Sequence, residues 1–533
     1  MTALSSYRQL RRYRQIAGVL ARHGLGALVE HLGLRRRLGP LLPGQGRLPP
    51  PGDTAATAVR VRRVLEELGP TFIKIGQIMS TRADLVPPPI LAELQKLQDR
   101  VPPAPFAAIR SEVERELQAP LESVFATFEP EPLAAASIGQ VHAARLHSGE
   151  EVAVKVQRPH VRQMIEADLD ILLGLAELAD RHSPWAQVYP FRDVAREIAR
   201  TLQRELDYIR EGTHAERLRR QAGHAPELYI PRVYWHLTTS RVLTLQRLRG
   251  RKLSEALQQG LDEPTRKAIA RRLVSGLLEQ ILVHGFFHAD PHPGNIVLLP
   301  DGRIGLLDFG IAGRLDQATR EQLAAFVIHL MRGRVDKLSA IIQELVNVPI
   351  RRADLRALHR DLEELRDRYY QVPFRQIEMS EVVRSFFTVL RQHRLRVPAD
   401  LTLVGKTLIT LEGVAVHLDP ELSVVAVAEP LGRRLLRDYT SARALSRHAL
   451  TRLENYAEPL VELPGLMRDV LLEAREGRPL ARIELGERGE LERSLSRFVN
   501  RLTFSILLLA FSLLFAALVV ASALTGRTVL PWG

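Results

Sequence analysis

The spacing of apolar residues changes character along the chain. After a Pro/Gly-rich stretch at 42–53, apolar positions recur at helical spacing to about residue 85, and proline clusters at 87–89 and 102–105 interrupt the pattern. From about residue 121 the pattern changes to short apolar runs of the kind that form strands. The chain is therefore predicted to begin with helices and to continue into a sheet-rich segment.

Residues 141–157 predict a β-hairpin, because two apolar runs flank the turn-forming sequence His147–Glu150. Side chains alternate along a strand, so three valines share one face of the second run, and Lys155 lies on the other face with Ala153. The valines are Val152, Val154 and Val156. A lysine opposite a valine face, beside a loop of small residues, is a candidate phosphate ligand.

Helices are predicted at roughly 160–220, strands near 229–247, and mostly helical sequence over 252–460. Short apolar runs separated by Asp, Pro and Gly interrupt this last stretch at 286–310. The order of elements indicates an α+β protein, with helices first, then a small sheet-rich lobe and a larger helical lobe.

The segment 502–524 carries no charge over 23 residues, which is enough to cross a hydrocarbon core of about 30 Å. Four arginines lie shortly before it and only Arg527 follows. By the positive-inside rule, the large N-terminal part stays in the cytoplasm. We expect a transmembrane helix at 501–525, and a buried core helix is the alternative.

Composition narrows the class of protein. The chain has 533 residues, too many for one compact core, and no cysteine, which excludes disulfides, cysteine-ligated zinc and iron–sulfur clusters. The net charge is +13, and residues 1–47 hold nine arginines against a single acid, Glu30. No nucleic-acid-binding motif accompanies them, so we expect no nucleic acid partner. A basic N-terminus that faces an anionic membrane is favoured, with a solvated helix or a transit peptide as alternatives.

The segment 286–310 carries the clearest chemistry. Asp290 and Asn295 are five residues apart, and Asp308 begins an Asp-Phe-Gly sequence. In phosphoryl transfer one Asp accepts or orients the proton of the nucleophile, while an Asn and a second Asp hold magnesium. A hairpin between Asn295 and Asp308 would bring both side chains to one metal. We therefore expect a two-lobed protein-kinase-like fold.

The loop before the predicted hairpin departs from a glycine-rich phosphate loop. Residues 134–136 are alanines, and Gly139 is the one glycine of the loop. Added β-carbons limit how closely such a loop can approach a γ-phosphate. A plain helix N-terminus capped by Ser137 is the alternative.

Taken in order, these motifs resemble the UbiB/ADCK (AarF-like) family of atypical protein-kinase-like proteins. The matching stretches, within about 60–430, are KIGQ at Lys74–Gln77, AAASIGQVH, VAVK ending at Lys155, ELDYIREG at Glu205–Gly212, HADPHPGN and DFG. The chain departs from the family in one clear C-terminal span where many members show two, and in His214 where asparagine is frequent.

Pattern and resemblance together predict six regions. They are a basic N-terminal helical region (1–56), a helical extension with the Lys-x-Gly-Gln motif (57–120), the two kinase-like lobes (121–250 and 251–430), a helical linker (431–500) and the transmembrane helix (501–525).

The resemblance implies a site for ATP or ADP with Mg²⁺. It implies that Lys155 pairs with Glu211 and contacts the α- and β-phosphates, that these two and Asp290 are catalytic, and that Asn295 and Asp308 hold the metal. The implied nucleotide contacts are Ala134, Ala135, Ala136, Ser137, Gly139, Gln140, Val141, Ala153 and Lys155. The alanines would bias nucleotide binding and suppress protein phosphorylation.

The resemblance also implies a regulatory gate, in which Lys74 pairs with Glu205 and lays an N-terminal helix over the place of a peptide substrate. The implied gate residues are Lys74, Gly76, Gln77, Glu205 and Asp207. Without the family context, Lys74 and Gln77 would indicate only a solvated helix face, one turn apart.

Two histidines flank Asp290, but no third ligand stands at zinc-like spacing, so we interpret His288 and His292 as structural. Ala289 stands where many protein kinases have arginine, and no Ala-Pro-Glu segment follows Asp308. The chain is therefore expected to handle ATP without acting as a signalling kinase.

The function implied by the resemblance is that of a bacterial inner-membrane atypical kinase or ATPase supporting isoprenoid quinone biosynthesis, ubiquinone in the first instance. Its expected partners are membrane lipid, isoprenoid quinone precursors and quinone-biosynthesis enzymes. Two alternatives stay open: a small-molecule kinase similar to aminoglycoside and choline kinases, and a nucleotide-gated lipid-binding scaffold.

Overall fold

The computed structural model describes most of the chain up to residue 440. The described residues are 3–24, 54–80, 82, 86–97, 101–182, 191–223, 227–346, 352–369, 372–373, 376–393, 395 and 397–440. All of them belong to one compact unit, Met1–Ser441. The predicted transmembrane helix at 501–525 and most of the predicted linker at 431–500 lie outside the described residues and stay predictions.

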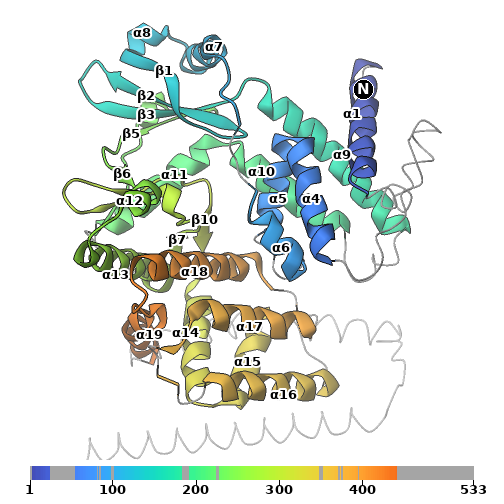
Figure 1. The fold of residues 1–533 in the computed structure, drawn as a ribbon, viewed down its shortest axis with the longest axis vertical. Helices are drawn as coiled ribbons and strands as arrows, with labels where there is room; N and C mark the ends of the chain where they lie inside the picture. The colour runs from blue at the N-terminus through green and yellow to red at the C-terminus, as the bar shows by residue number, and fades with distance from the viewer. Residues whose placement is uncertain are drawn as a thin grey trace, which may run out of the picture. The chain divides into compact units, whose positions relative to one another are not determined.

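The first lobe is built on a four-stranded antiparallel sheet in the order β1-β2-β3-β5 (Figure 1). The strands are β1 (Phe125–Ala135), β2 (Gly139–Leu146), β3 (Glu151–Gln157) and β5 (Val242–Gln246). The predicted hairpin is therefore confirmed, with Val141 opposite Lys155. Its turn contains Gly149 at a φ of 90°, a conformation that favours glycine.

One face of this sheet is covered by two helices, α7 (Phe106–Leu117) and α8 (Leu121–Val124) (Figure 1). Ile109 and Val113 of α7 pack in one apolar cluster with the three valines of β3, all five side chains being fully buried. The valine face is therefore the core face, as predicted, which leaves Lys155 on the opposite face. Helix α7 falls within the predicted extension at 57–120, yet it packs on the sheet.

Seven further helices lie among the described residues of the N-terminal half. They are α1 (Ala3–Arg22), α4 (Thr54–Leu68), α5 (Pro70–Met79), α6 (Pro88–Leu94), α9 (Val161–His182), α10 (Phe191–Glu205) and α11 (Tyr208–Ala222). A second apolar cluster joins α1, α4, α5, α9 and α10. Figure 1 shows this group beside the sheet, with α5 next to α10.

Helix α1 uses its apolar face to pack against the body of the protein. Ile16 and Val19 are buried in the cluster with α4 and α9. The Arg12 guanidinium lies 2.7 Å from Asp168 of α9, and it donates to the carbonyl of Leu68 at 2.9 Å. The apolar face of α1 therefore packs against other helices of the protein, whereas the sequence favoured a membrane surface for the basic region. This holds for the described part of that region.

The second lobe is mostly helical. Its helices are α12 (Leu253–Gln259), α13 (Glu263–Glu279), α14 (Gln317–Met331), α15 (Val335–Val346), α16 (Arg352–Tyr369), α17 (Met379–Gln392), α18 (Ala399–Leu418) and α19 (Val424–Thr440). Short strands form a sheet in the order β4-β9-β8-β6 and a separate β10-β7 pair. These strands are β4 (Leu228–Tyr229), β6 (Arg251–Lys252), β7 (Phe286–His288), β8 (Ile296–Leu298), β9 (Ile304–Leu306) and β10 (Ala312–Arg314). Single helical turns occur at Trp235–Leu237, Gln280–His284 and Pro293–Asn295.

Among the described residues, one helix, α18, is long and apolar enough by length and composition to cross a membrane. More than half of its most apolar stretch is buried, and it packs against α13 and α17 within the second lobe. Leu411 and Ala415 are fully buried there. Helix α18 is therefore apolar because it packs in the core of the second lobe. It is distinct from the segment predicted to span the membrane.

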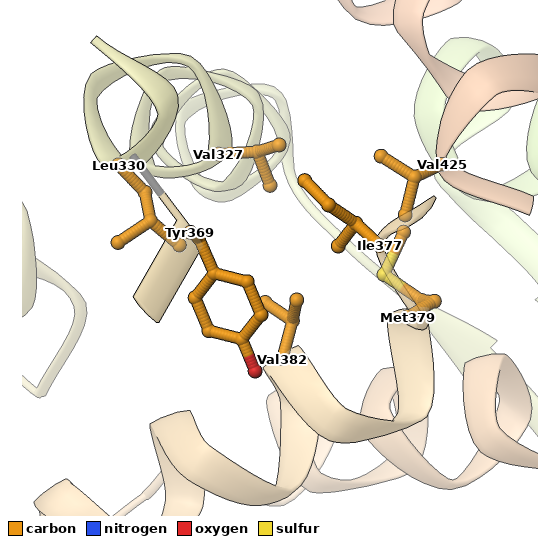
Figure 2. Close-up of a pocket in the computed structure, with 7 residues that line it drawn as sticks. All are labelled: Val327, Leu330, Tyr369, Ile377, Met379, Val382 and Val425. Atoms are coloured by element: carbon orange, nitrogen blue, oxygen red, sulfur yellow. The ribbon is translucent and has the colours of Figure 1, made fainter. Parts of the chain in front are cut away.

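A small apolar cavity lies among the helices of the second lobe (Figure 2). Its lining residues are Val327, Leu330, Tyr369, Ile377, Met379, Val382 and Val425. Its volume is about 10 Å³, room for about one water molecule. None of the predicted site residues lines it, and an isoprenoid chain would not fit in it.

Candidate functional site

Lys155 on β3 forms an ion pair with Glu211 on α11. Its ammonium nitrogen lies 2.7 Å and 2.8 Å from the two carboxylate oxygens, so both oxygens are engaged. Glu211 is buried, and Lys155 also lies 3.5 Å from Oδ1 of Asp308. The predicted Lys155–Glu211 contact is therefore present in the structure, and it fixes α11 against the sheet.

The charges around Lys155 change the ionisation of its partners. Burial alone would lower the pKa of Lys155, but Asp308 and Glu211 raise it well above its ordinary value. The Lys155 ammonium lowers the pKa of Asp308, and Lys74 adds a smaller effect in the same direction. Lys155 is thus held as a cation and Asp308 as an anion.

The segment 286–310 forms the opposite wall of the site. Strands β8 and β9 pair with Ile296 opposite Leu306, and the amide of Leu307 donates to the carbonyl of Asn295 at 2.8 Å. The predicted hairpin is confirmed, and it brings Asn295 next to the residue that precedes Asp308. Antiparallel pairing accounts for the proximity, because it aligns the start of one strand with the end of the other.

Asn295 and Asp308 present the oxygen atoms that a magnesium ion prefers. The Asn295 amide nitrogen donates to the Asp290 carbonyl at 3.2 Å, which leaves its oxygen for a ligand. The Asp308 side chain is about half exposed (53%), and its backbone lies in the left-handed region at a φ of 59°. The donor set therefore fits Mg²⁺.

His288 supports both halves of this wall. Its imidazole is fully buried, with Nε2–H donating to the carbonyl of Leu307 at 2.9 Å and Nδ1 accepting from the amide of Asp290 at 3.2 Å. Burial lowers the pKa of His288 and so keeps the ring neutral. His292 accepts from the amide of Gly294. Both contacts fit the structural role predicted.

The alanine-rich loop joins β1 to β2. Ala134 and Ala135 pair with β2, and the amide of Ala136 donates to the carbonyl of Gly139 at 2.8 Å. The Arg158 side chain, just beyond β3, donates to the carbonyl of Ala136 at 2.9 Å. The loop is therefore a braced strand-to-strand turn, and the alternative of a helix capped by Ser137 does not apply.

Gly139 is required by packing at the base of this turn. A β-carbon there would overlap the hydroxyl of Tyr208 and would lie 2.7 Å from the carbonyl oxygen of Val156. Tyr208 is the first residue of α11 and is 1% exposed, with its ring 5.2 Å from the Lys155 ammonium. Gly139 thus lets α11 approach the sheet closely enough for Glu211 to reach Lys155.

We predict that Gly139→Ala destabilises the protein by roughly 1–3 kcal/mol, the usual range for an overpacked core position. Because part of the overlap is with the Tyr208 hydroxyl, adding Tyr208→Phe should return some of the lost stability. Thermal unfolding of the two single variants and the double variant measures this coupling. Strictly additive effects would show that the two residues do not share the contact.

Gln140 differs from its predicted role. Its side chain is 1% exposed and lies on the valine face of the sheet, whereas Val141 and Ala153 lie on the Lys155 face. The Gln140 oxygen accepts from the amide of Ala104 at 2.8 Å, and its nitrogen donates to Nε2 of His142 at 2.7 Å. The side chain is committed to the core, because alternate positions of β2 point to opposite faces.

This network gives the stability of the first lobe a pH dependence. Burial lowers the pKa of His142, against a smaller opposing effect of its hydrogen bond to Glu129. The folded protein therefore resists protonation, and stability present above the ordinary histidine value of about 6.5 is lost as pH falls. We expect the melting temperature of the full chain to drop between pH 7.5 and 5.5, and the drop to be smaller in His142→Asn. Equal drops in both proteins would contradict this origin.

The five predicted gate residues make different contacts. Lys74 of α5 lies 3.0 Å from a carboxylate oxygen of Glu205 at the end of α10, and both side chains are largely buried. Gly76 lets Leu65 and Leu97 pack against α5, and the Gln77 amide donates to the carbonyl of Leu97 at 3.3 Å. Asp207 caps α11 by accepting from the amide of Ile209. Of these five, Lys74 and Glu205 form an ion pair between the extension and α10, to which Arg82 and Glu197 add a second pair at 2.6 Å.

Sequence reasoning missed one charged neighbour of the predicted catalytic residue. Lys406 of α18 lies 3.0 Å from Oδ1 of Asp290. The hydroxyl of the next residue, Thr407, lies 3.3 Å from the carbonyl of Ala289, across 118 residues of sequence, and 2.8 Å from the carbonyl of Leu403. No local pattern around Lys406 marks it, because its helix reads only as an apolar segment.

The structure has a sheet lobe with a paired lysine, a helical lobe, and a wall of Asp, Asn and Asp between them. This combination defines a protein-kinase-like protein. Residues 96–342 match the ABC1 atypical kinase-like domain, and residues 362–423 match the UbiB helical domain. The chain belongs to the UbiB family of atypical kinase-like proteins, as the sequence motifs predicted.

Relatives named "Probable protein kinase UbiB" include one from Xanthomonas campestris pv. campestris (strain B100), 36% identical over 93% of this chain and 91% of that protein. One from Xylella fastidiosa (strain M23) is 36% identical over 94% of this chain and 92% of its own length. Among solved structures, the Mycobacterium tuberculosis protein of "The complex structure of Rv3197-erythromycin" matches with a TM-score of 0.49 and 24% identity, over 71% of this chain and 96% of that chain.

Proposed function

We propose that this chain is a magnesium-dependent ATPase of the UbiB type that supports isoprenoid quinone biosynthesis at a membrane. The observation that carries the enzymatic part is the meeting of Lys155, Asp290, Asn295 and Asp308 in one site, with Lys155 fixed by Glu211. The residue types are those that phosphoryl transfer uses, and their closeness to one another supports these roles.

The residues take distinct roles in this proposal. Lys155, positioned by Glu211, binds the α- and β-phosphates of ATP or ADP. The oxygens of Asn295 and Asp308 hold the Mg²⁺ that neutralises phosphate charge. Asp290 accepts the proton of the attacking nucleophile. Ala134, Ala135 and Ala136 limit closure of the loop, and Arg158 braces it through the carbonyl of Ala136.

Two features favour water or a small acceptor over a protein substrate. Helix α14 begins at Gln317, nine residues after Asp308, so the intervening segment is short for a peptide platform. Helix α5 lies next to α10 and pairs with it through Lys74 and Glu205. We infer that α5 covers the place of a peptide substrate and acts as a gate.

The quinone part of the proposal rests on the family and on the names of the relatives. The apolar segment at 502–524 would anchor the protein in the bacterial inner membrane, with the described body in the cytoplasm. An ATPase held there could extract apolar-tailed quinone precursors and present them to biosynthetic enzymes. Membrane lipid and these precursors are therefore the partners we propose.

The test is ATP hydrolysis by the purified full chain in lipid nanodiscs. We expect turnover that requires Mg²⁺ and rises when anionic lipid and a polyprenylated phenol, a mimic of a quinone precursor, are added. Asp290→Asn should lose turnover and keep nucleotide binding. Turnover indifferent to lipid and phenol would count against lipid handling, and turnover unchanged in Asp290→Asn would favour a nucleotide-gated scaffold.

A further inference from the structure

Helix α18 reaches the catalytic loop with two adjacent residues. The Lys406 ammonium lies 3.0 Å from Oδ1 of Asp290, and the two side chains are 23% and 29% exposed, so both remain accessible to solvent. Thr407 is fully buried, and its hydroxyl lies 2.8 Å from the carbonyl of Leu403 in its own helix and 3.3 Å from the carbonyl of Ala289. Figure 1 shows α18 alongside α13, beneath the strands that carry the loop.

The position of Lys406 is set by rigid packing. The Glu412 carboxylate, one and a half turns further along α18, accepts from the amides of Met379 and Ser380 at 2.6 Å each, at the start of α17. Gly405 lets Phe387 of α17 pack directly on the α18 backbone. Held in this way, the lysine needs little reorganisation to act on a neighbouring group.

The catalytic loop itself supplies no comparable cation. The sequence HADPHPGN contains no lysine or arginine, and the lysine on the sheet side, Lys155, is already engaged by Glu211 and Asp308. The phosphoryl group in transfer carries negative charge on three oxygens, and fixed cations are the usual means of stabilising it. Lys406 borders Asp290 as a permanent cation, whereas His292, whose Nε2 lies 3.8 Å from Oδ2 of Asp290, is charged only when protonated.

We propose that Lys406 is a catalytic residue, supplied by the UbiB helical domain, that orients Asp290 and donates to the phosphoryl group during its transfer. The inference rests on the proposed ATPase function and deepens it. It also assigns a catalytic part to residues 362–423, the span of the helical-domain match.

In the reaction, Lys406 donates to Oδ1 of Asp290 and turns Oδ2 toward the nucleophile. The oxygen of water forms a bond to the γ-phosphorus, and the bond from that phosphorus to the β–γ bridging oxygen breaks, leaving its electron pair on ADP. The proton of the attacking water passes to Oδ2 of Asp290. Lys406 keeps its proton and stabilises the charge of the transferred group.

The experiment compares Lys406→Met and Lys406→Arg with the wild type, as full chains in nanodiscs. Lys267→Met is the matched control, because Lys267 forms an exposed helix pair with Glu263 on α13. Two quantities are measured for each protein: the kcat and KM of ATP hydrolysis, and the binding of Mg·ADP with and without aluminium fluoride, a mimic of the transferred phosphoryl group.

We expect Lys406→Met to lower kcat by roughly 100-fold, the usual effect of losing one transition-state donor, while KM and Mg·ADP affinity stay within about threefold. Aluminium fluoride should no longer increase the affinity for Mg·ADP in Lys406→Met, and it should increase that affinity in part in Lys406→Arg. The Lys267→Met control should match the wild type in every measurement.

The outcomes separate this inference from the proposed function. If the wild type turns over and Lys406→Met keeps kcat and the fluoride effect, the inference is wrong and the ATPase proposal stands. If the wild type binds no Mg·ADP, both are wrong. If Lys406→Met melts at a lower temperature than the wild type, Lys406→Gln provides a second neutral side chain. Wild-type kcat in Lys406→Gln would likewise overturn the inference.

Discussion

Replacing Asp308 with asparagine should reduce Mg²⁺-dependent ATP hydrolysis by roughly 1,000-fold, because a metal ligand contributes several kcal/mol to the transition state. Asparagine tolerates the left-handed backbone of this position, at a φ of 59°, so the fold should persist. Lys155 keeps its pair with Glu211 at 2.7 Å. The measurement is steady-state hydrolysis over a range of Mg²⁺ concentrations, together with thermal unfolding.

The control is Asp301→Asn, which changes an exposed aspartate that pairs with Arg303 in the turn between β8 and β9. It makes the same chemical change in the same hairpin, away from the site. The control should hydrolyse ATP at the wild-type rate. Hydrolysis by Asp308→Asn within tenfold of the wild type would remove Asp308 from the metal site.

The second large effect concerns the contact between the extension and α10. Lys74→Met leaves the Glu205 side chain, 8% exposed, without the ammonium of its ion pair. Uncompensated buried charge of this kind costs about 3–5 kcal/mol. We expect a loss of stability in that range, measured by chemical unfolding of the full chain.

Two further variants identify the cause. Adding Glu205→Leu to Lys74→Met removes the unpaired charge, so the double variant should be more stable than Lys74→Met alone. Lys96→Met removes an exposed lysine whose partner Glu93 keeps its ion pair with Arg62, so the change should cost under about 1 kcal/mol. If Lys74→Met proved as mild as Lys96→Met, the Lys74–Glu205 pair would not hold the extension in place.

The parts of the site that were predictable from the sequence depend on short-range geometry. Alternation along β3 placed Lys155 opposite the three core valines, and those valines are fully buried. The β8–β9 hairpin placed Asn295 beside Asp308, because few residues separate the paired strands. The Lys155–Glu211 and Lys74–Glu205 pairs came from the family resemblance, since no local rule joins residues so far apart.

Other features depend on tertiary contacts that no pattern in the sequence records. The contact between Gly139 and Tyr208 requires α11 to fold back onto the sheet, so the glycine looked like a remnant of a phosphate loop. Gln140 looked like a nucleotide contact because the strand register, which turns it toward Ala104 and His142, was not known. Lys406 lies on a helix whose composition indicates only burial, and its neighbour Thr407 meets the catalytic loop across 118 residues.

The measurement that tests the account most directly is the isoprenoid quinone content of a strain from which the gene has been deleted, complemented with the wild-type chain or with Asp308→Ala. We predict that the wild type restores quinone and that Asp308→Ala, expressed at the same level in the membrane, does not. Equal restoration by both proteins would contradict an ATP-dependent role and favour a scaffold. Normal quinone in the uncomplemented strain would contradict the role in quinone biosynthesis altogether.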